Sequence, residues 1–313
     1  MGKAIRIFFV TDIHGSNLCY RKFLNALKVY NVDVGILLGD LTGKVLIPLI
    51  ERAGGGWETT LMRHHTIIDT QDELDKLKKT IEMMGYYWIH QTPEEFQCYK
   101  DDPLEVNRLF NELMMQRLKE WIILADERLA GSSYKVYMAP GNDDHFEVDQ
   151  VIEDSAVIVN CNNKNIMVGE HEMVTFSWAN PTPWNTPREK PDEELEPMLE
   201  ALVAKVNDKS NAIFNFHVPP YGFALDLAPE LTKDLVQAAD RKIHVGSKAV
   251  AKMIEKYQPL LGLHGHIHES RGAQKIKRTL IINPGSEYSE GILKGAVIVT
   301  EKGKVKDYVF TSG

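Results

Sequence analysis

Residues 5–14 read IRIFFVTDIH, an apolar run that gives way to polar residues with the spacing Asp-x-His. A short apolar run that ends at polar residues is typical of a buried strand, which we expect over 4–10. Asp12 and His14 then lie in the loop after this strand. An apolar run followed by a polar cluster recurs four more times, which indicates that strand ends carry the function of this chain.

The four later polar clusters are Asp40 after ILLG (36–39), Asn142, Asp143 and Asp144 after MAPG (138–141), His217 after IFNF (213–216), and His264, His266 and His268 after LLGL (260–263). In open α/β sheets, ligands bind outside the carboxyl ends of the strands, because the loops there converge on one crevice. We therefore expect all five clusters to meet in a single site, although they span most of the chain.

Apolar runs and helical patterns alternate along the whole sequence, which predicts an α/β fold in one domain, residues 1–313. Besides 4–10, the predicted strands are 32–38, 134–139, 156–159, 174–178, 212–216, 260–263, 279–282, 295–300 and 305–310. The predicted helices are 16–30, 72–84, 104–129, 192–207 and 247–257.

The segment 43–131 separates two strands that a βαβ unit would keep close in sequence. It holds a glycine run at 54–56 and an apolar stripe at helical spacing over 106–129. Such a stripe is typical of a helix that packs on a core, so we expect a mostly helical insertion. The sequence leaves two interpretations open: a cap over the site, or an elaboration that does not contact substrate.

The formal net charge of −8 argues against a general nucleic-acid binder, which needs basic surface to displace counterions. The amino-terminal apolar run is too short for a signal peptide, and no stretch is long enough to span a bilayer. Three cysteines, Cys19, Cys98 and Cys161, are far apart and lack CxxC spacing. They indicate reduced thiols, and we expect a cytoplasmic protein.

The polar clusters have the composition of a metal site. Imidazole nitrogens, carboxylates and an amide oxygen, without thiolates, suit divalent ions such as Mn²⁺, Fe²⁺ or Zn²⁺. Seven good ligands exceed what one tetrahedral ion uses, whereas two ions that share a bridging carboxylate would use them all. Each cluster alone is weak: Asp40 fits a turn, and Asp12 fits a helix cap. The combination carries the prediction.

Taken in order, Asp12-x-His14, Gly39-Asp40, Gly141-Asn142, His217 and Gly265-His266-x-His268 resemble the motif set of the calcineurin-like metallophosphoesterases. The stretches 244–247 and 282–286 are similar to the small phosphohydrolase branch of that family. The resemblance spans residues 12–268 and implies a sandwich of two mixed β-sheets flanked by helices. It also implies ligand roles: Asp12, His14 and His268 for one ion, Asn142, His217 and His266 for the other, and Asp40 as the bridge.

The resemblance implies an enzyme that hydrolyses a small-molecule phosphate mono- or diester, with a hydroxide held between the two ions. A phosphodiesterase is the expected form. The family usually has a histidine directly after the asparagine, and here Asp143 stands in its place, with His145 two residues on. Asp143 and His145 are thus the candidate catalytic groups. His264 and Asp144 are expected to orient the ligands from outside.

Three other interpretations remain open at this point. A nuclease would use the same chemistry but needs a basic track, and a non-catalytic scaffold on this fold would be expected to lose ligands. A hydrolase with one zinc ion would bind a single metal per chain. The proline-rich loop 181–188 presents Trp184 and Arg188, which either contact a base or a phosphate or belong to a rigid surface loop. The oligomeric state is not predicted.

Overall fold

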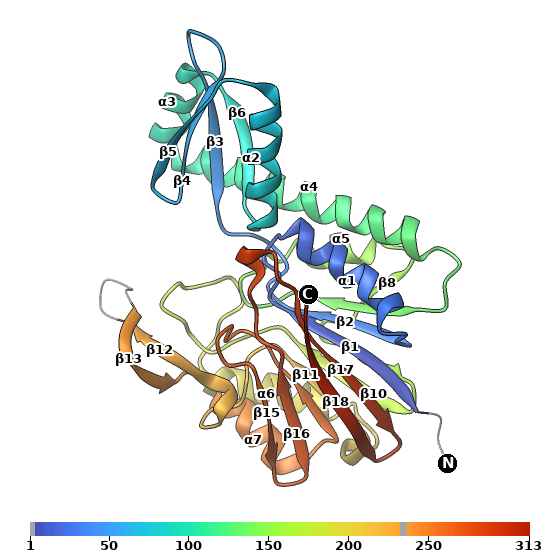
Figure 1. Cartoon of the computed structure of the whole chain (residues 1–313). Coiled ribbons are helices and arrows are strands. Elements are labelled where there is room, and N and C mark those ends of the chain that lie inside the picture. Colours follow the sequence, from blue (N-terminus) through green and yellow to red (C-terminus); the bar gives the residue numbers. More distant parts are fainter. Residues whose placement is uncertain (1–3, 232–236) are drawn as a thin grey trace.

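The computed structural model describes residues 4–231 and 237–313, and two six-stranded sheets form its centre (Figure 1). The first sheet has the order β18-β17-β1-β2-β7-β8, in which β1, β2, β7 and β8 run parallel. Its strands are β1 (Ile5–Thr11), β2 (Val34–Leu38), β7 (Lys135–Ala139), β8 (Ile158–Asn160), β17 (Lys294–Glu301) and β18 (Lys304–Ser312). Because β17 and β18 pair antiparallel, this sheet is mixed.

The second sheet has the order β15-β16-β14-β11-β10-β9 and is also mixed. The strands β10, β11, β14 and β16 run parallel, and an antiparallel strand closes each edge. They are β9 (Asn165–Val168), β10 (His171–Phe176), β11 (Ile213–Phe216), β14 (Leu261–Leu263), β15 (Gly272–Ile276) and β16 (Thr279–Asn283). The predicted pair of mixed sheets is confirmed.

The alternation of side chains along β1 explains how the layers stack. Phe8 and Val10 pack with the helices α1 (Asn17–Val29), α4 (Pro103–Leu129) and α5 (Val148–Glu153). Ile7 and Phe9 point the other way, into an apolar layer between the two sheets. On the other face of the second sheet, a third apolar layer lies between its strands and the helices α6 (Asp192–Val203) and α7 (Lys248–Tyr257). The result is a helix–sheet–sheet–helix sandwich, as the sequence predicted.

The segment after β2 forms a separate lobe that stands away from the sandwich (Figure 1). It contains a four-stranded sheet, β5-β4-β3-β6, with its own small core. Its elements are β3 (Leu46–Glu51), β4 (Trp57–Leu61), β5 (His64–Ile68), α2 (Gln71–Met83), β6 (Tyr87–Gln91) and α3 (Pro93–Asp101). The prediction of a mostly helical insertion missed this sheet, because β3 contains Pro48 and β5 is largely exposed, so neither shows clean alternation.

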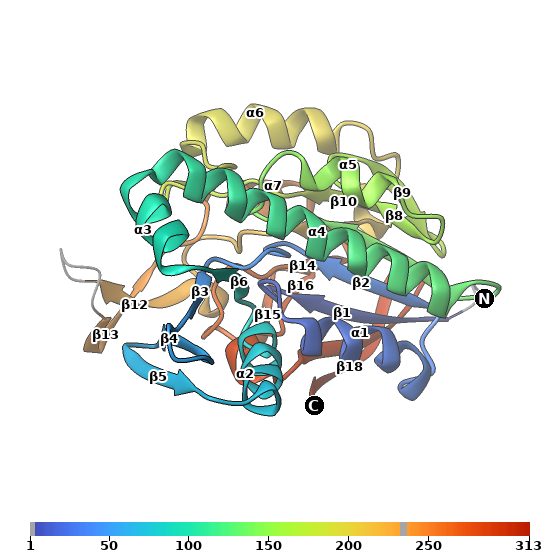
Figure 2. The ribbon, with the colours of Figure 1, turned by 90° about the horizontal axis from the view of Figure 1, so that it is seen from above.

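Helix α4 returns the chain from the lobe to the sandwich, running from beside α3 towards α1 (Figure 2). Leu118, Trp121 and Ile122 are buried in the sandwich core, whereas the apolar residues of its first half range from Leu104, which is 81% exposed, to Met114, which is 2% exposed. The remaining elements are the hairpin β12 (Leu227–Leu231) and β13 (Gln237–His244) and three short 3₁₀ turns (Lys209–Asn211, Ala224–Asp226, Tyr288–Glu290). None of the helices in the described ranges combines the length and apolar character that a membrane span requires.

Candidate metal centre

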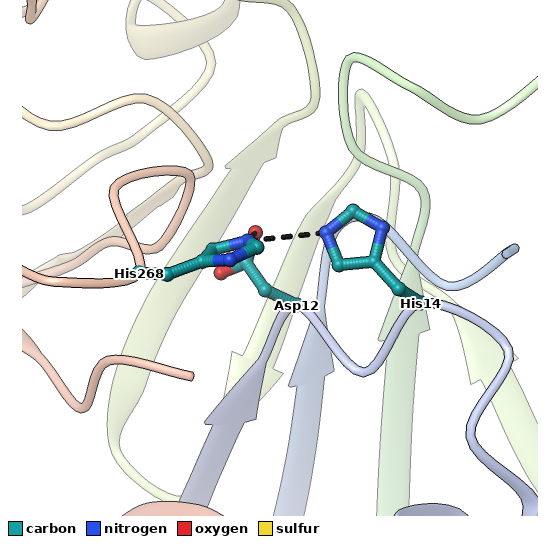
Figure 3. A group of neighbouring side chains, drawn as sticks. All are labelled: Asp12, His14 and His268. Atoms are coloured by element: carbon teal, nitrogen blue, oxygen red, sulfur yellow. Dashed lines mark hydrogen bonds and ion pairs between the residues drawn. The ribbon is translucent and has the colours of Figure 1, made fainter. Parts of the chain in front are cut away.

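The predicted ligands converge at the carboxyl ends of β1, β2 and β7 from one sheet and of β11 and β14 from the other. One group consists of Asp12, His14 and His268 (Figure 3). The Nε2 atoms of His14 and His268 are 3.1 Å apart, and His268 Nε2 lies 3.6 Å from Asp12 Oδ1. Two imidazole nitrogens and a carboxylate oxygen that face one point are a donor set for a divalent cation.

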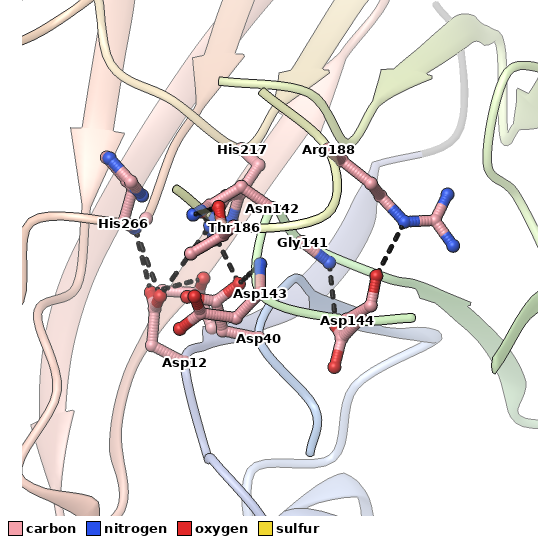
Figure 4. A network of polar contacts seen from close by, with 12 residues as sticks. Asp12, Asp40, Gly141, Asn142, Asp143, Asp144, Thr186, Arg188, His217 and His266 are labelled. Carbon is pink, nitrogen blue, oxygen red and sulfur yellow. Dashed lines mark hydrogen bonds and ion pairs between the residues drawn. The ribbon is translucent and has the colours of Figure 1, made fainter. Parts of the chain in front are cut away.

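The second group consists of Asp40, His217 and His266, with Asn142 beside them (Figure 4). His217 Nε2 lies 3.0 Å from Asn142 Oδ1 and 3.3 Å from Asp40 Oδ1. The other oxygen, Asp40 Oδ2, lies 3.6 Å from His14 Nε2 in the first group. One carboxylate therefore presents one oxygen to each group, which is the arrangement that a bridging ligand needs.

The charges of the site favour a bound cation. Burial, and then the nearby Lys44 ammonium, hold the pKa of His14 well below its ordinary value, so this imidazole is neutral as a ligand must be. Burial also lowers the pKa of His266 to about 4. At His217 burial acts in the same direction, but Asp40 outweighs it and raises the pKa to about 9. The carboxylates thus attract positive charge here, and a divalent ion can take the place of that proton.

The backbone around the ligands is strained. Four non-glycine residues of the site have left-handed backbone angles, with φ of 54° at Asp12, 39° at His14, 48° at Asp40 and 65° at His266. Such conformations persist only where the surrounding structure imposes them, and they cluster at functional sites. The strain here turns side chains from both sheets towards one point.

Glycines in the motifs leave the space that this convergence requires. A Cβ on Gly141 would lie 2.2 Å from Asp40 Oδ1, and one on Gly265 would lie 2.4 Å from Asp12 Oδ2. Both distances are shorter than any real contact, so a larger residue would displace a ligand.

A hydrogen-bond chain fixes the orientation of Asn142. Its Nδ2 donates to Thr186 Oγ1 at 2.8 Å, and the Thr186 hydroxyl in turn donates to the carboxylate of Glu189. Thr186 can therefore only accept from the amide, which directs Asn142 Oδ1 towards His217. Thr186 could not be predicted from the sequence, because its role depends on the approach of two distant loops.

Asp144 and His264 lie next to the ligands and tie the ligand loops together. The Asp144 carboxylate accepts from the backbone N–H groups of Leu41 and Thr42, each at 2.9 Å, and of Gly141 at 2.8 Å. The loop after β2 is thus fastened to the loop after β7. His264 Nδ1 lies 2.8 Å from the Phe216 carbonyl, and burial lowers the pKa of His264 to about 4. This neutral imidazole joins the ends of β14 and β11.

Asp143 lies beside the two groups, and its carboxylate forms an ion pair with Lys44. The Asp143 backbone N–H donates to Asp40 Oδ1 at 3.1 Å, and Asp143 Oδ2 is 4.0 Å from His14 Nδ1. Burial and then Asp40 raise the pKa of Asp143 to about 7, against the effect of Lys44. Lys44 was missed at the sequence level, although it lies only four residues after Asp40 in the same loop.

His145 does not join the other site residues. It lines a different cavity of about 630 Å³ formed largely by α4, because the chain turns away after Asp144 towards α5. Arg188 is also turned away from the ligands: it is buried and donates to the Asp144 and His145 carbonyls, each at 2.9 Å, and to Asp149 at 2.8 Å. Arg188 therefore holds the 144–149 segment, which favours the structural one of the two interpretations of this residue.

A cleft of about 450 Å³ opens beside the metal ligands. The ligand side of the cleft contains Asp40, Asn142, His266 and His268, together with the Lys44–Asp143 pair. The opposite side comes from the β12–β13 hairpin and the loop with Trp184. The rings of His14 and of Tyr288, whose centroids are 4.6 Å apart, pack at the edge of the first ligand group.

Comparisons with known proteins agree with this arrangement. The sequence profile of the calcineurin-like phosphoesterases matches residues 5–270. An uncharacterised protein of Methanocaldococcus jannaschii is 35% identical over 162 residues, which cover 50% of this chain and 68% of the relative. A crystal structure of a Thermus thermophilus protein superposes with a TM-score of 0.51 at 14% identity, covering 96% of this chain and 99% of that chain.

A second solved structure superposes with a TM-score of 0.56 at 14% identity and covers 96% of this chain and 100% of its own. At this level of identity the two structures support the fold alone. The profile match covers most of the sequence and includes all five polar clusters. The chain therefore belongs to the calcineurin-like phosphoesterase family.

Proposed function

We propose that this protein is a phosphodiesterase that hydrolyses a small-molecule phosphate ester with two divalent cations, Mn²⁺, Fe²⁺ or Zn²⁺. Asp12, His14 and His268 hold one cation, Asn142, His217 and His266 hold the other, and Asp40 joins them. The observation that supports this most strongly is the placement of Asp40, with one oxygen 3.3 Å from His217 Nε2 and the other 3.6 Å from His14 Nε2. Bound cations would activate water and stabilise the charge on the phosphoryl oxygens.

The residues around the cations set the charge that a substrate meets. Two divalent cations bring four positive charges, and Asp12 and Asp40 bring two negative ones. The remaining positive charge attracts a phosphate anion even though the whole chain carries a net charge of −8. Five of the seven ligands, all except His266 and His268, are almost completely buried, so this attraction is only weakly screened by salt.

The Lys44–Asp143 pair supports a preference for diesters. Asp143 occupies the position where the family usually has a histidine, and an ionised carboxylate there would repel a phosphate dianion. Lys44 forms an ion pair with that carboxylate and offsets only part of its charge. A diester carries one negative charge and a monoester up to two, so the diester is penalised less.

Metal removal and readdition test the proposed function. We expect chelated, dialysed protein to hydrolyse neither bis(p-nitrophenyl) phosphate nor p-nitrophenyl phosphate, and one of the three named cations to restore turnover. We expect kcat/KM for the diester to exceed that for the monoester by about tenfold or more, since one extra charge near a carboxylate costs over 1 kcal/mol. Two ions per chain by elemental analysis should accompany full activity. No turnover with any of these cations would contradict the proposal and favour a non-catalytic scaffold.

A double substitution tests the role of Lys44. At about pH 9, Lys44→Ala should lower kcat/KM about tenfold, because the Asp143 carboxyl, whose pKa rises further without Lys44, is ionised there and repels the substrate. Adding Asp143→Asn to Lys44→Ala should recover most of this loss. The control is Lys164→Ala, which removes a lysine of similar exposure from an ion pair with Glu153 elsewhere on the surface. If the second substitution recovers nothing, Lys44 contacts the phosphate directly instead of neutralising Asp143.

A further inference from the structure

The cleft beside the metal ligands has two unlike walls. One wall is polar and consists of the ligand side chains and the Lys44–Asp143 pair. The other is apolar, and its main residues are Pro183, Trp184, Pro229, Leu231, Ile243 and Val245. A molecule that fills this cleft must therefore combine an anionic group with an apolar one.

Trp184 is the most exposed large side chain of the apolar wall, with 62% of its surface accessible. When a flat apolar group covers a solvent-exposed tryptophan ring beside a cleft, apolar surface is removed from water and the free energy falls. The loop that carries Trp184 is well ordered by its own hydrogen bonds. The backbone N–H of Trp184 donates to Thr182 Oγ1 at 3.2 Å, and the Thr182 hydroxyl donates to Glu189 at 2.6 Å. The backbone that carries the ring is thus held in place before any ligand binds.

The same loop reaches the metal centre. Glu189 accepts hydrogen bonds from both Thr182 and Thr186, and Thr186 orients the ligand Asn142. The backbone that carries Trp184 is therefore coupled through one carboxylate to the position of a metal ligand. A substrate that contacts both would have its phosphate placed by the same short loop.

The hairpin supplies the rest of the apolar wall. Ile243 and Val245 alternate along the chain and so face the same side, and they are only partly buried. The base of the hairpin is fixed by Asp226, which binds His244 Nδ1 at 2.6 Å and accepts from Gly246 N–H at 3.1 Å. Ile243 and Val245 thus form an apolar surface that lines the same cleft as Trp184.

The charge at the edge of this wall limits what binds there. Glu269 lines the cleft next to the ligand His268 and presents a carboxylate. A second phosphate on the apolar side would be repelled by this group. The apolar part of the ligand is therefore uncharged.

We infer that the substrate is a phosphodiester in which one ester group is an uncharged aromatic moiety that packs against Trp184 and the hairpin. This inference rests on the proposed function and adds the class of substrate. The ring of a simple aryl group and the base of a nucleoside are both flat, uncharged and aromatic, so either could pack against Trp184.

Binding of two matched monoanions tests the inference. The monomethyl esters of phenylphosphonic and methylphosphonic acid imitate a diester in charge and differ in one apolar group. We expect isothermal titration calorimetry on the Mn²⁺-loaded protein to give about tenfold tighter binding of the phenyl compound, a common discrimination for an apolar pocket. In Trp184→Ala and in Ile243→Ser this preference should fall towards parity. Met167→Ala removes an apolar side chain of similar exposure from β9 and should retain the preference.

Equal binding of the two esters by the unchanged protein would overturn the inference, as would a phenyl preference that survives in both Trp184→Ala and Ile243→Ser. Thymidine 5′-methylphosphonate distinguishes the two sources of the ring. Tighter binding than that of the phenyl ester would identify the aromatic group as a nucleoside, and weaker binding would identify it as a simple aryl group. The metal readdition assay separates this result from failure of the proposed function, because hydrolysis of bis(p-nitrophenyl) phosphate does not require a preference between the two phosphonates.

Discussion

Asp40→Ala is expected to abolish hydrolysis and to weaken the binding of both cations at once. In the structure the two carboxylate oxygens of Asp40 lie 3.3 Å and 3.6 Å from imidazole nitrogens of different ligand groups. Its loss removes a ligand and a negative charge from both cation positions. We expect kcat/KM to fall by more than about a thousandfold, since cations supply several kcal/mol of transition-state stabilisation.

The measurement combines turnover with metal content. Asp40→Ala should reduce the ions per chain from two towards none under conditions that saturate the unchanged protein. His266→Ala is the matched comparison, because His266 belongs to one group only, and it should lower the affinity for one ion while the other is retained. Full turnover by Asp40→Ala would refute the bridging role. A single ion per chain in the unchanged, fully active protein would favour the one-zinc interpretation.

Gly39→Ala should disable the site without unfolding the chain. A Cβ on Gly39 would lie 2.0 Å from His217 Nδ1, and φ at Gly39 is +73°. The left-handed angle alone costs about 1–2 kcal/mol of stability for an L-residue. The collision adds a second effect, because the His217 imidazole must move out of its place. We expect an activity loss of about a hundredfold, as small misplacements of catalytic groups cost that much.

Gly303→Ala separates the two effects. Gly303 has nearly the same backbone angle, +72°, but, its chain neighbours apart, no atom of residues 4–231 or 237–313 lies within 4 Å of the position of its Cβ. Both variants should lose stability in urea unfolding, Gly39→Ala at least as much as Gly303→Ala, whereas only Gly39→Ala should lose activity and metal affinity. Equal activity of the two variants would mean that the His217 imidazole has room to shift without consequence.

The sequence predicts most of the sandwich because its central strands are covered on both faces. Runs such as IFFV in β1 and ILL in β2 are almost fully buried, and continuous apolar runs of this kind are easy to recognise. In the lobe, β3 (LIPLIE) alternates in burial but carries apolar residues on both faces, and β5 is largely exposed; β12 of the hairpin is partly exposed throughout, so the sequences of these strands show no clear period. Which segments pair there is decided by contacts that the local sequence does not reveal.

The same distinction applies to the site. Residues directly after buried strands, such as Asp12 and His217, could be placed from the sequence because the sheet fixes where each strand ends. His145 could not, because a separation of two residues along a loop does not tell on which side the chain turns. Lys44 and Thr186 act through partners about a hundred and about forty residues away in sequence, and only the fold brings them together.

Each cation position draws side chains from both sheets: His268 and His266 follow β14, whereas His14 and Asn142 follow strands of the other sheet. A bound ion would therefore act as a cross-link between two halves of the molecule that otherwise adhere through an apolar layer. Unfolding must break that cross-link, so cation concentration and thermal stability are linked quantities. An ion present at a hundred times its dissociation constant contributes about 2.7 kcal/mol to the free energy of unfolding. The catalytic metals of this protein would then also be part of what keeps its two sheets together.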